Sequence, residues 1–106
     1  MFDPNDYIFI STGERGTKTD AQVLSNHYGK VIRLHDDGRV PEDNPFVNTA
    51  NTMPEIWCFG NRNIQGMVYD DRNNILWAHE HGSKGGDEIN IIEKGKNYAF
   101  LSEEIV

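Results

Sequence analysis

The stretch WAHEHGSKGGDEIN, residues 77–90, gathers side chains that could bind a metal ion or a cofactor. His79 and His81 flank Glu80, and because alternate residues of a strand share a face, the two imidazoles would point the same way. A His-x-His pair is half of a transition-metal site, and the spacing of the other two histidines does not supply the missing ligands. A zinc or iron site and a structural histidine pair at a strand end both remain open.

The bend HGSKGGDE that follows has three glycines close together, so its backbone can turn carbonyl oxygens toward a ligand. Carbonyl oxygens with carboxylates nearby are the hard ligands that calcium prefers. The spacing differs from that of a calcium-binding helix–loop–helix and from that of a phosphate-binding loop. The bend is therefore compatible with a calcium site and with an ordinary polar turn.

A third stretch, GNRNIQG at residues 60–66, carries Arg62 and Asn63 between two glycines at the end of an apolar run. A planar guanidinium beside an amide suits anionic or quinone oxygens. The alternative is a polar loop with an exposed arginine.

Short β-rich runs separated by turn residues must position these three stretches. We expect seven strands, at residues 7–12, 30–34, 55–59, 66–69, 75–79, 88–92 and 98–101. Turns such as DDG and DDRNN follow them at the spacing of an all-β sandwich, barrel or propeller. Residues 20–28 are the one place that could hold a short helical turn. Seven strands make less than two four-stranded propeller blades, so we expect residues 1–106 to be a partial domain, truncated at both ends.

Composition excludes several classes of protein. The chain has 106 residues and a formal net charge of −7, so nucleic acid is not an expected partner. It contains no apolar run long enough for a membrane span and no visible signal peptide. Cys58 is the single cysteine, and its place in the apolar run IWCFG favours a core position over a nucleophilic one.

Taken in order, the motifs resemble a known family. The run EIWCFGNRNIQGMVYD, then LWAHEHGSKGGDEINIIEKGKNYAF, and upstream STGERG and SNHYGKVIRLHDDGRVPEDNPF, are similar to the soluble quinoprotein glucose/sorbosone dehydrogenases, which include the aldose sugar dehydrogenases. The resemblance spans roughly residues 5–100. It implies a six-bladed β-propeller that uses pyrroloquinoline quinone (PQQ) and Ca²⁺ to oxidise the C1 hydroxyl of aldose sugars. It also implies a periplasmic or secreted location, an external electron acceptor and a homodimer.

The resemblance also assigns roles to individual residues. Arg62 and Asn63 match the pair that contacts the quinone, and His81 matches a position that faces the cofactor. The remaining matches are to calcium ligands: the backbone carbonyls of Gly82 and Ser83 at the active-site ion, and Glu88 and Tyr98 at a second, structural ion.

The chain departs from the family pattern at several positions. Asn61 and Ile64 replace a histidine and a proline around Arg62, and Ser83 replaces a proline. The histidine that acts as general base in the family matches no position here and is expected upstream of this chain. The rival interpretation from another class is a non-catalytic propeller that binds a carbohydrate or a protein.

Overall fold

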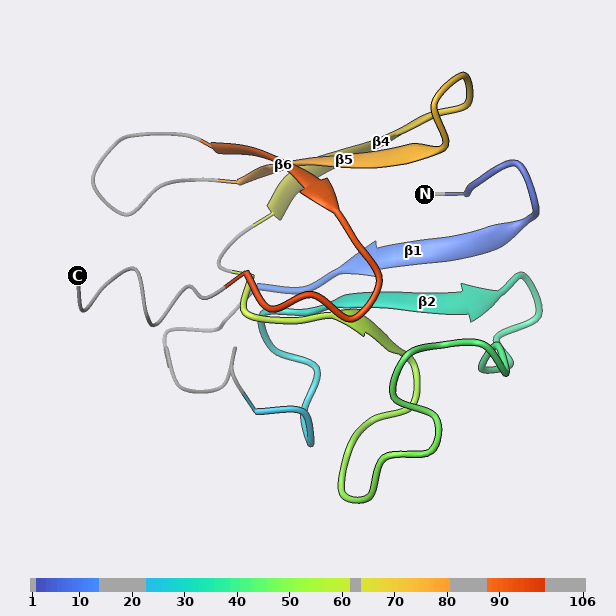
Figure 1. The fold of residues 1–106 in the computed structure, drawn as a ribbon, viewed down its shortest axis with the longest axis vertical. Coiled ribbons are helices and arrows are strands. Elements are labelled where there is room, and N and C mark those ends of the chain that lie inside the picture. The colour runs from blue at the N-terminus through green and yellow to red at the C-terminus, as the bar shows by residue number, and fades with distance from the viewer. Residues whose placement is uncertain (1, 14–22, 62–63, 81–87, 99–106) are drawn as a thin grey trace.

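The computed structural model describes residues 2–13, 23–61, 64–80 and 88–98, which form two antiparallel three-stranded sheets (Figure 1). The first sheet consists of β1 (Tyr7–Ser11), β2 (Val31–His35) and β3 (Ile56–Cys58), and the second of β4 (Ile64–Asp70), β5 (Ile75–Glu80) and β6 (Glu88–Ile92). Strands adjacent in the chain are adjacent in each sheet. The all-β expectation and the first six expected strands are confirmed.

Two sequence-based expectations fall partly on residues that the structure does not describe. The helical turn expected at residues 20–28 is wrong for the part the structure describes, because residues 23–28 form only turns and irregular backbone. The seventh expected strand falls mainly outside the described residues. Just before it, Asn97 forms a parallel bridge with Phe59, at the end of β3.

Alternation of side chains gives each sheet one face toward the core. In β5, Leu76, Ala78 and Glu80 are buried, whereas His79 between them is exposed. This agrees with the alternation expected around Glu80. Two of the described turns contain a residue with a left-handed backbone, Gly38 after β2 (φ 90°) and Asn74 before β5 (φ 54°).

The two sheets meet through an apolar core to which every strand contributes. Its buried members are Phe9, Val31, Cys58, Ile64, Leu76, Ala78 and Ile92. Burial of this kind stabilises by roughly 25 cal/mol for each Å² of apolar surface removed from water. The core therefore fixes the relative positions of the strand ends from which the candidate site residues emerge.

Arg33 fastens the long connection between β2 and β3. Its guanidinium lies 3.7 Å from the ring centroid of Tyr7 and 4.6 Å from that of Trp57, and it donates to Asp43 (2.9 Å) and Asn44 (3.2 Å). Asn44 returns a hydrogen bond to the Arg33 carbonyl at 3.0 Å. Aromatic faces and charge-assisted bonds suit a buried arginine, so residues 36–54 are held against the first sheet.

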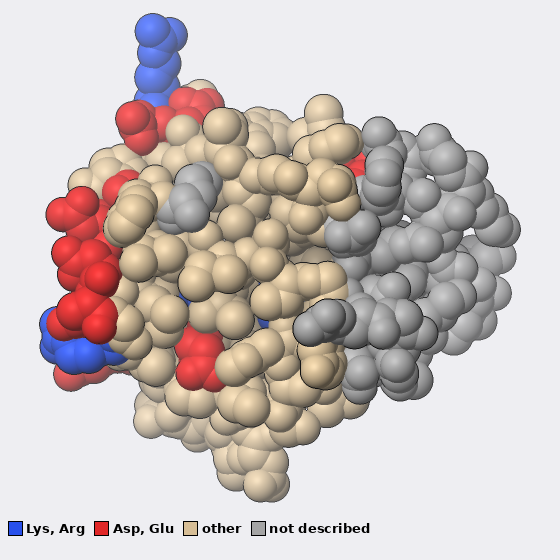
Figure 2. Space-filling view, turned by 180° about the vertical axis from the view of Figure 1, so that it is seen from behind, with Lys and Arg blue, Asp and Glu red and all other residues tan. Residues whose placement is uncertain are grey.

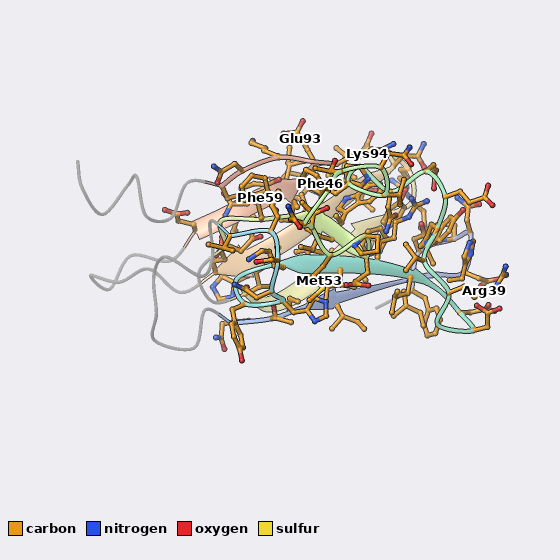
Figure 3. All side chains as sticks on the ribbon, turned by 90° about the horizontal axis from the view of Figure 1, so that it is seen from below. Arg39, Phe46, Met53, Phe59, Glu93 and Lys94 are labelled. Atoms are coloured by element: carbon orange, nitrogen blue, oxygen red, sulfur yellow. The ribbon has the colours of Figure 1, made fainter. Side chains whose placement is uncertain are left out.

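The same connection reaches the candidate site end of the molecule. The rings of Phe46 and Phe59 make an edge contact with centroids 5.9 Å apart, and Figure 3 shows them close together. Phe59 follows β3 immediately. Packing of the long connection therefore supports the backbone that leads into residues 60–63.

Charged side chains are distributed unevenly. In Figure 2 the visible carboxylates gather largely on the side away from the residues drawn in grey. Within the described ranges, no helix has the length and hydropathy needed to cross a membrane.

Candidate cofactor and calcium site

The segments predicted to hold the cofactor and calcium leave the two sheets at one end. β3 ends at Cys58 and β4 begins at Ile64, so Arg62 and Asn63 belong to the crossing between the sheets. β5 ends at Glu80 and β6 begins at Glu88, so residues 81–87 join two neighbouring strands at that same end (Figure 1). The topology therefore brings both predicted segments to one edge of the molecule.

Five of the predicted site residues lie outside the described residues: Arg62, Asn63, His81, Gly82 and Ser83. Their roles stay predictions. Glu88 and Tyr98 are described, together with the residues that anchor the predicted segments on either side.

The backbone of residues 59–61, directly before Arg62, is hydrogen-bonded to two other segments of the chain. The Phe59 N–H donates to the Lys96 carbonyl at 3.1 Å, and the Tyr98 N–H donates to the Phe59 carbonyl at 2.9 Å. On the other side the Asn61 N–H donates to the Gly29 carbonyl at 3.0 Å. These bonds fix the backbone directly before the predicted quinone-binding pair.

Asn61 itself is fully buried and only partly satisfied. Its Oδ1 lies 3.5 Å from the Cys58 thiol, within reach of a weak S–H hydrogen bond, whereas its Nδ2 has no hydrogen-bond partner. Buried donors are almost always paired in folded proteins. An orphaned amide next to the predicted pair fits a site that a further polar group completes.

At the end of β5, Glu80 is a buried carboxylate, only 5% exposed. Asn90 on β6 donates its Nδ2 hydrogen to Glu80 Oε2 at 2.9 Å. Glu80 and Glu88 are direct cross-strand partners, and Glu88 is exposed. Both residues carry carboxylates, which are hard oxygen donors of the kind that calcium prefers.

Tyr98 uses its hydroxyl inside the protein. The hydroxyl donates to the Ile91 carbonyl and accepts a hydrogen bond from the Glu93 N–H at 2.7 Å. Partial burial raises the pKa of the Tyr98 phenol above its ordinary value, so it stays protonated near neutral pH. If Tyr98 binds calcium as the resemblance implies, its backbone carbonyl is the available ligand.

Other combinations of ligands do not come together in the described ranges. Among those residues, no group of three or more His, Cys, Asp and Glu side chains could hold a metal ion. Cys58 is completely buried, and desolvation raises the pKa of its thiol far above the ordinary value. Since the thiolate is the nucleophile, this supports the interpretation of Cys58 as a core residue.

Sequence reasoning missed a second feature at the same end. The His27 Nε2 lies 2.6 Å from Glu55 Oε1, and His27 lines a cavity of about 350 Å³ with Thr12, Gly13 and Tyr28. The motif SNHYG shows a histidine near a glycine but does not indicate which distant carboxylate approaches it. That pairing requires the end of β1, the start of β2 and the start of β3 to meet.

Lys30 follows His27 and Tyr28 in the chain, directly before β2. It is completely buried, and its Nζ donates to the Tyr28 carbonyl and to Asn26 Oδ1, the latter at 3.3 Å. A buried ammonium requires such oxygen partners, because desolvating a charge is costly. The bonds hold the turn before β2 in place.

Comparisons with known proteins support the sequence motifs. The family model described as "Glucose / Sorbosone dehydrogenase" matches residues 1–102. The chain is 48% identical over 100 residues to the aldose sugar dehydrogenase YliI of Escherichia coli, a match covering 94% of this chain and 27% of that protein. It is 36% identical over 98 residues to quinoprotein glucose dehydrogenase B of Acinetobacter calcoaceticus, covering 89% of this chain and 20% of that protein.

Solved structures of aldose sugar dehydrogenases share the fold of this chain. The apo form of the soluble aldose sugar dehydrogenase of Escherichia coli matches with a TM-score of 0.88 at 49% identity, covering 92% of this chain and 28% of that one. The PQQ-bound aldose sugar dehydrogenase of Streptomyces coelicolor matches with a TM-score of 0.79 at 34% identity, covering 92% of this chain and 27% of that one. The two sheets correspond to part of a β-propeller, and the chain spans about a quarter of the length of these relatives. The chain belongs to the glucose/sorbosone dehydrogenase family.

Proposed function

We propose that this chain is part of a quinoprotein dehydrogenase that oxidises the C1 hydroxyl of an aldose sugar, with PQQ as cofactor and Ca²⁺ as its metal ion. The observation that carries the proposal is the convergence of two predicted segments at one end of the sheets. The crossing that contains Arg62 and the β5–β6 connection that contains Gly82 begin and end at neighbouring strand ends. Family membership supports it, because the Escherichia coli and Streptomyces coelicolor proteins reported above are named aldose sugar dehydrogenases, and the Streptomyces coelicolor structure is PQQ-bound.

The chain's own residues would bind and orient the cofactor. Arg62 presents a planar set of N–H donors for quinone oxygens and would stabilise negative charge that develops on them. Asn63 would add an amide donor, and His81 would face the ring. Bound PQQ would supply the hydride acceptor and Ca²⁺ would polarise it, so the protein's own contribution is positioning and electrostatics.

Calcium binding would draw on two groups of oxygen atoms. The carbonyls of Gly82 and Ser83 would serve the ion at the quinone, whereas Glu88 and the carbonyl of Tyr98 would serve a structural ion. The general base, a histidine in the family, would come from elsewhere in the full-length protein. The external electron acceptor, the homodimer and the periplasmic or secreted location remain predictions from the resemblance.

Reconstitution of the full-length protein tests the proposal. The purified apo protein would be titrated with PQQ at saturating Ca²⁺, and dye reduction would be followed with glucose and with glucose deuterated at C1. We expect activity that depends on both cofactors and is slowed by the deuterium. The variant Arg62→Ala should bind PQQ about ten- to a hundredfold more weakly, since one charge-assisted interaction is lost.

Two results would refute this function. One is dye reduction that persists without PQQ. The other is sugar binding without any PQQ-dependent turnover, which would establish the non-catalytic binding module instead.

A further inference from the structure

The sequence contains one Asp-Gly bond, between Asp37 and Gly38, and it lies in the exposed turn that follows β2. A bond of this kind can rearrange without an enzyme. The glycine nitrogen attacks the Cγ atom of the aspartic acid, and the amide hydrogen leaves with the carboxyl hydroxyl as water. The resulting succinimide ring then reopens with water to aspartate or isoaspartate. Glycine favours the attack because no side chain stands beside its nitrogen.

Burial does not protect this bond in the described structure. The side chains of Asp37 and Arg39 are 51% and 74% exposed, and Figure 3 shows Arg39 at the edge of the molecule. Gly38 has a φ of 90°, and among the described residues a Cβ at this position would meet no atom within 4 Å. Any protection must therefore come from the turn itself.

Hydrogen bonds in the turn occupy both reacting groups. The Asp37 carboxylate accepts from the Arg39 backbone N–H at Oδ1 (3.0 Å) and from the Arg39 Nε–H at Oδ2 (2.6 Å). The Gly38 N–H, whose nitrogen would have to attack Cγ, donates instead to the His35 carbonyl at 3.0 Å. The succinimide ring can close only after the carboxylate leaves Arg39 and the Gly38 N–H leaves His35.

The same contacts keep the carboxylate ionised. The Arg39 backbone N–H, followed by the Arg39 guanidinium, holds the pKa of Asp37 below its ordinary value. Succinimide forms from the neutral acid, because an ionised carboxylate has no hydroxyl to lose as water. A lowered pKa reduces the neutral fraction at every pH above it, so the reaction slows.

We infer that Asp37 is a site of isoaspartate formation and that Arg39 protects it. The inference does not depend on the proposed function. Isoaspartate adds one carbon atom to the main chain, so the hydrogen bond that closes the turn, from the His35 N–H to the Arg39 carbonyl at 2.8 Å, would be displaced. Rearrangement would therefore alter the first residues of the connection between β2 and β3.

Peptide mapping of the full-length protein tests the inference. Wild type and Arg39→Gln would be incubated at about pH 6, where carboxyl groups are mostly ionised, and isoaspartate at residue 37 would be quantified by electron-transfer fragmentation. A synthetic peptide of residues 33–42 gives the unprotected rate. Wild type should react at least about tenfold more slowly than the peptide, because the turn must open first. Arg39→Gln should react about two- to fivefold faster than wild type, since an exposed ion pair restrains its partners only modestly.

Two comparisons separate protection by Arg39 from a general loosening of the turn. Arg72→Gln removes the same charge from the β4–β5 turn, which has no Asp-Gly bond, and should leave the rate at Asp37 unchanged. The excess rate of Arg39→Gln over wild type should shrink toward about pH 3, because both proteins then carry a largely neutral Asp37. A turn that is merely looser would react faster by the same factor at every pH.

Three results would overturn the inference. The first is an equal rate of isoaspartate formation in wild type and Arg39→Gln, or an excess that does not change with pH. The second is a folded wild-type protein that reacts as fast as the peptide. The third is a peptide that forms no isoaspartate at Asp37, because the bond would then need no protection.

Discussion

Replacing Asn44 by alanine should loosen the long β2–β3 connection by an amount that the structure allows us to estimate. Asn44 is 3% exposed; it accepts from Arg33 at 3.2 Å and donates to the carbonyls of Arg33 (3.0 Å) and Pro54 (3.2 Å). Three bonds at about 1 kcal/mol each, with partial compensation by water at the newly opened site, give a loss of about 2–3 kcal/mol. The matched control is Asp43→Asn: its carboxylate is 65% exposed, so loss of its ion pair with Arg33 should cost at most about 1 kcal/mol.

Hydrogen–deuterium exchange of the full-length protein measures this loss locally. The reporter is the Arg33 N–H, which donates to the Glu55 carbonyl at 2.9 Å where the connection rejoins the sheet. Asn44→Ala should speed its exchange roughly 30- to 140-fold, and Asp43→Asn by less than about sixfold. Equal effects of the two variants, or no effect of Asn44→Ala, would show that the connection is not fastened through Asn44.

Three further predictions concern other parts of the described structure. Tyr98→Phe removes the hydroxyl that donates to the Ile91 carbonyl, and it should lower the unfolding free energy measured in urea by about 1–2 kcal/mol. The Ca²⁺ affinity measured by calorimetry should not change, because a backbone carbonyl ligand survives the substitution. Loss of Ca²⁺ binding would instead show that the hydroxyl is the ligand. Burial raises the pKa of Cys58, so the unfolded thiol ionises above its ordinary pKa of 9.0 while the folded thiol keeps its proton, and stability falls as the pH rises above that value. The unfolding free energy measured in urea should therefore fall less steeply between about pH 8 and pH 10 in Cys58→Ala than in the wild type, by up to about 1.4 kcal/mol per pH unit. An equally steep fall in both proteins would contradict this prediction. The outer face of the second sheet exposes Val68 (63%) and Ile89 (73%), so the isolated 106-residue chain should self-associate. The double variant Val68→Lys, Ile89→Lys should have a lower apparent mass in light scattering than the wild-type chain. A monomeric wild-type chain would refute that expectation.

The strands were predictable because their signals are local. Alternation of apolar residues between turn motifs marks six strands whose positions agree with the structure to within a few residues. The turns DDG and DDRNN were also legible, since turn formation depends on a few adjacent residues. The structure places left-handed residues in them, Gly38 and Asn74. The helical turn expected at residues 20–28 fails where the structure describes it. There the Leu24 carbonyl accepts a hydrogen bond from the distant Met53 N–H at 2.8 Å, and weak periodicity does not outweigh such a tertiary contact.

For the candidate site too, the sequence predicted some features and not others. Its predicted residues were found by motif order, and the topology places their segments at one end of the sheets. The sequence did not indicate that Asn61 would be bound to Gly29, that Glu80 would be buried and held by Asn90, or that His27 would meet Glu55.

These contacts are decided by tertiary structure for a physical reason. A residue's type limits what it can bond to, but its partner depends on which strand ends pack together and on which face of each sheet is withdrawn from water. In this chain the sequence by itself determined the strands, their turns and the family. The packing of the two sheets alone decided which polar groups are buried beside the candidate site, and which of them, as with the Asn61 amide, still lacks a partner.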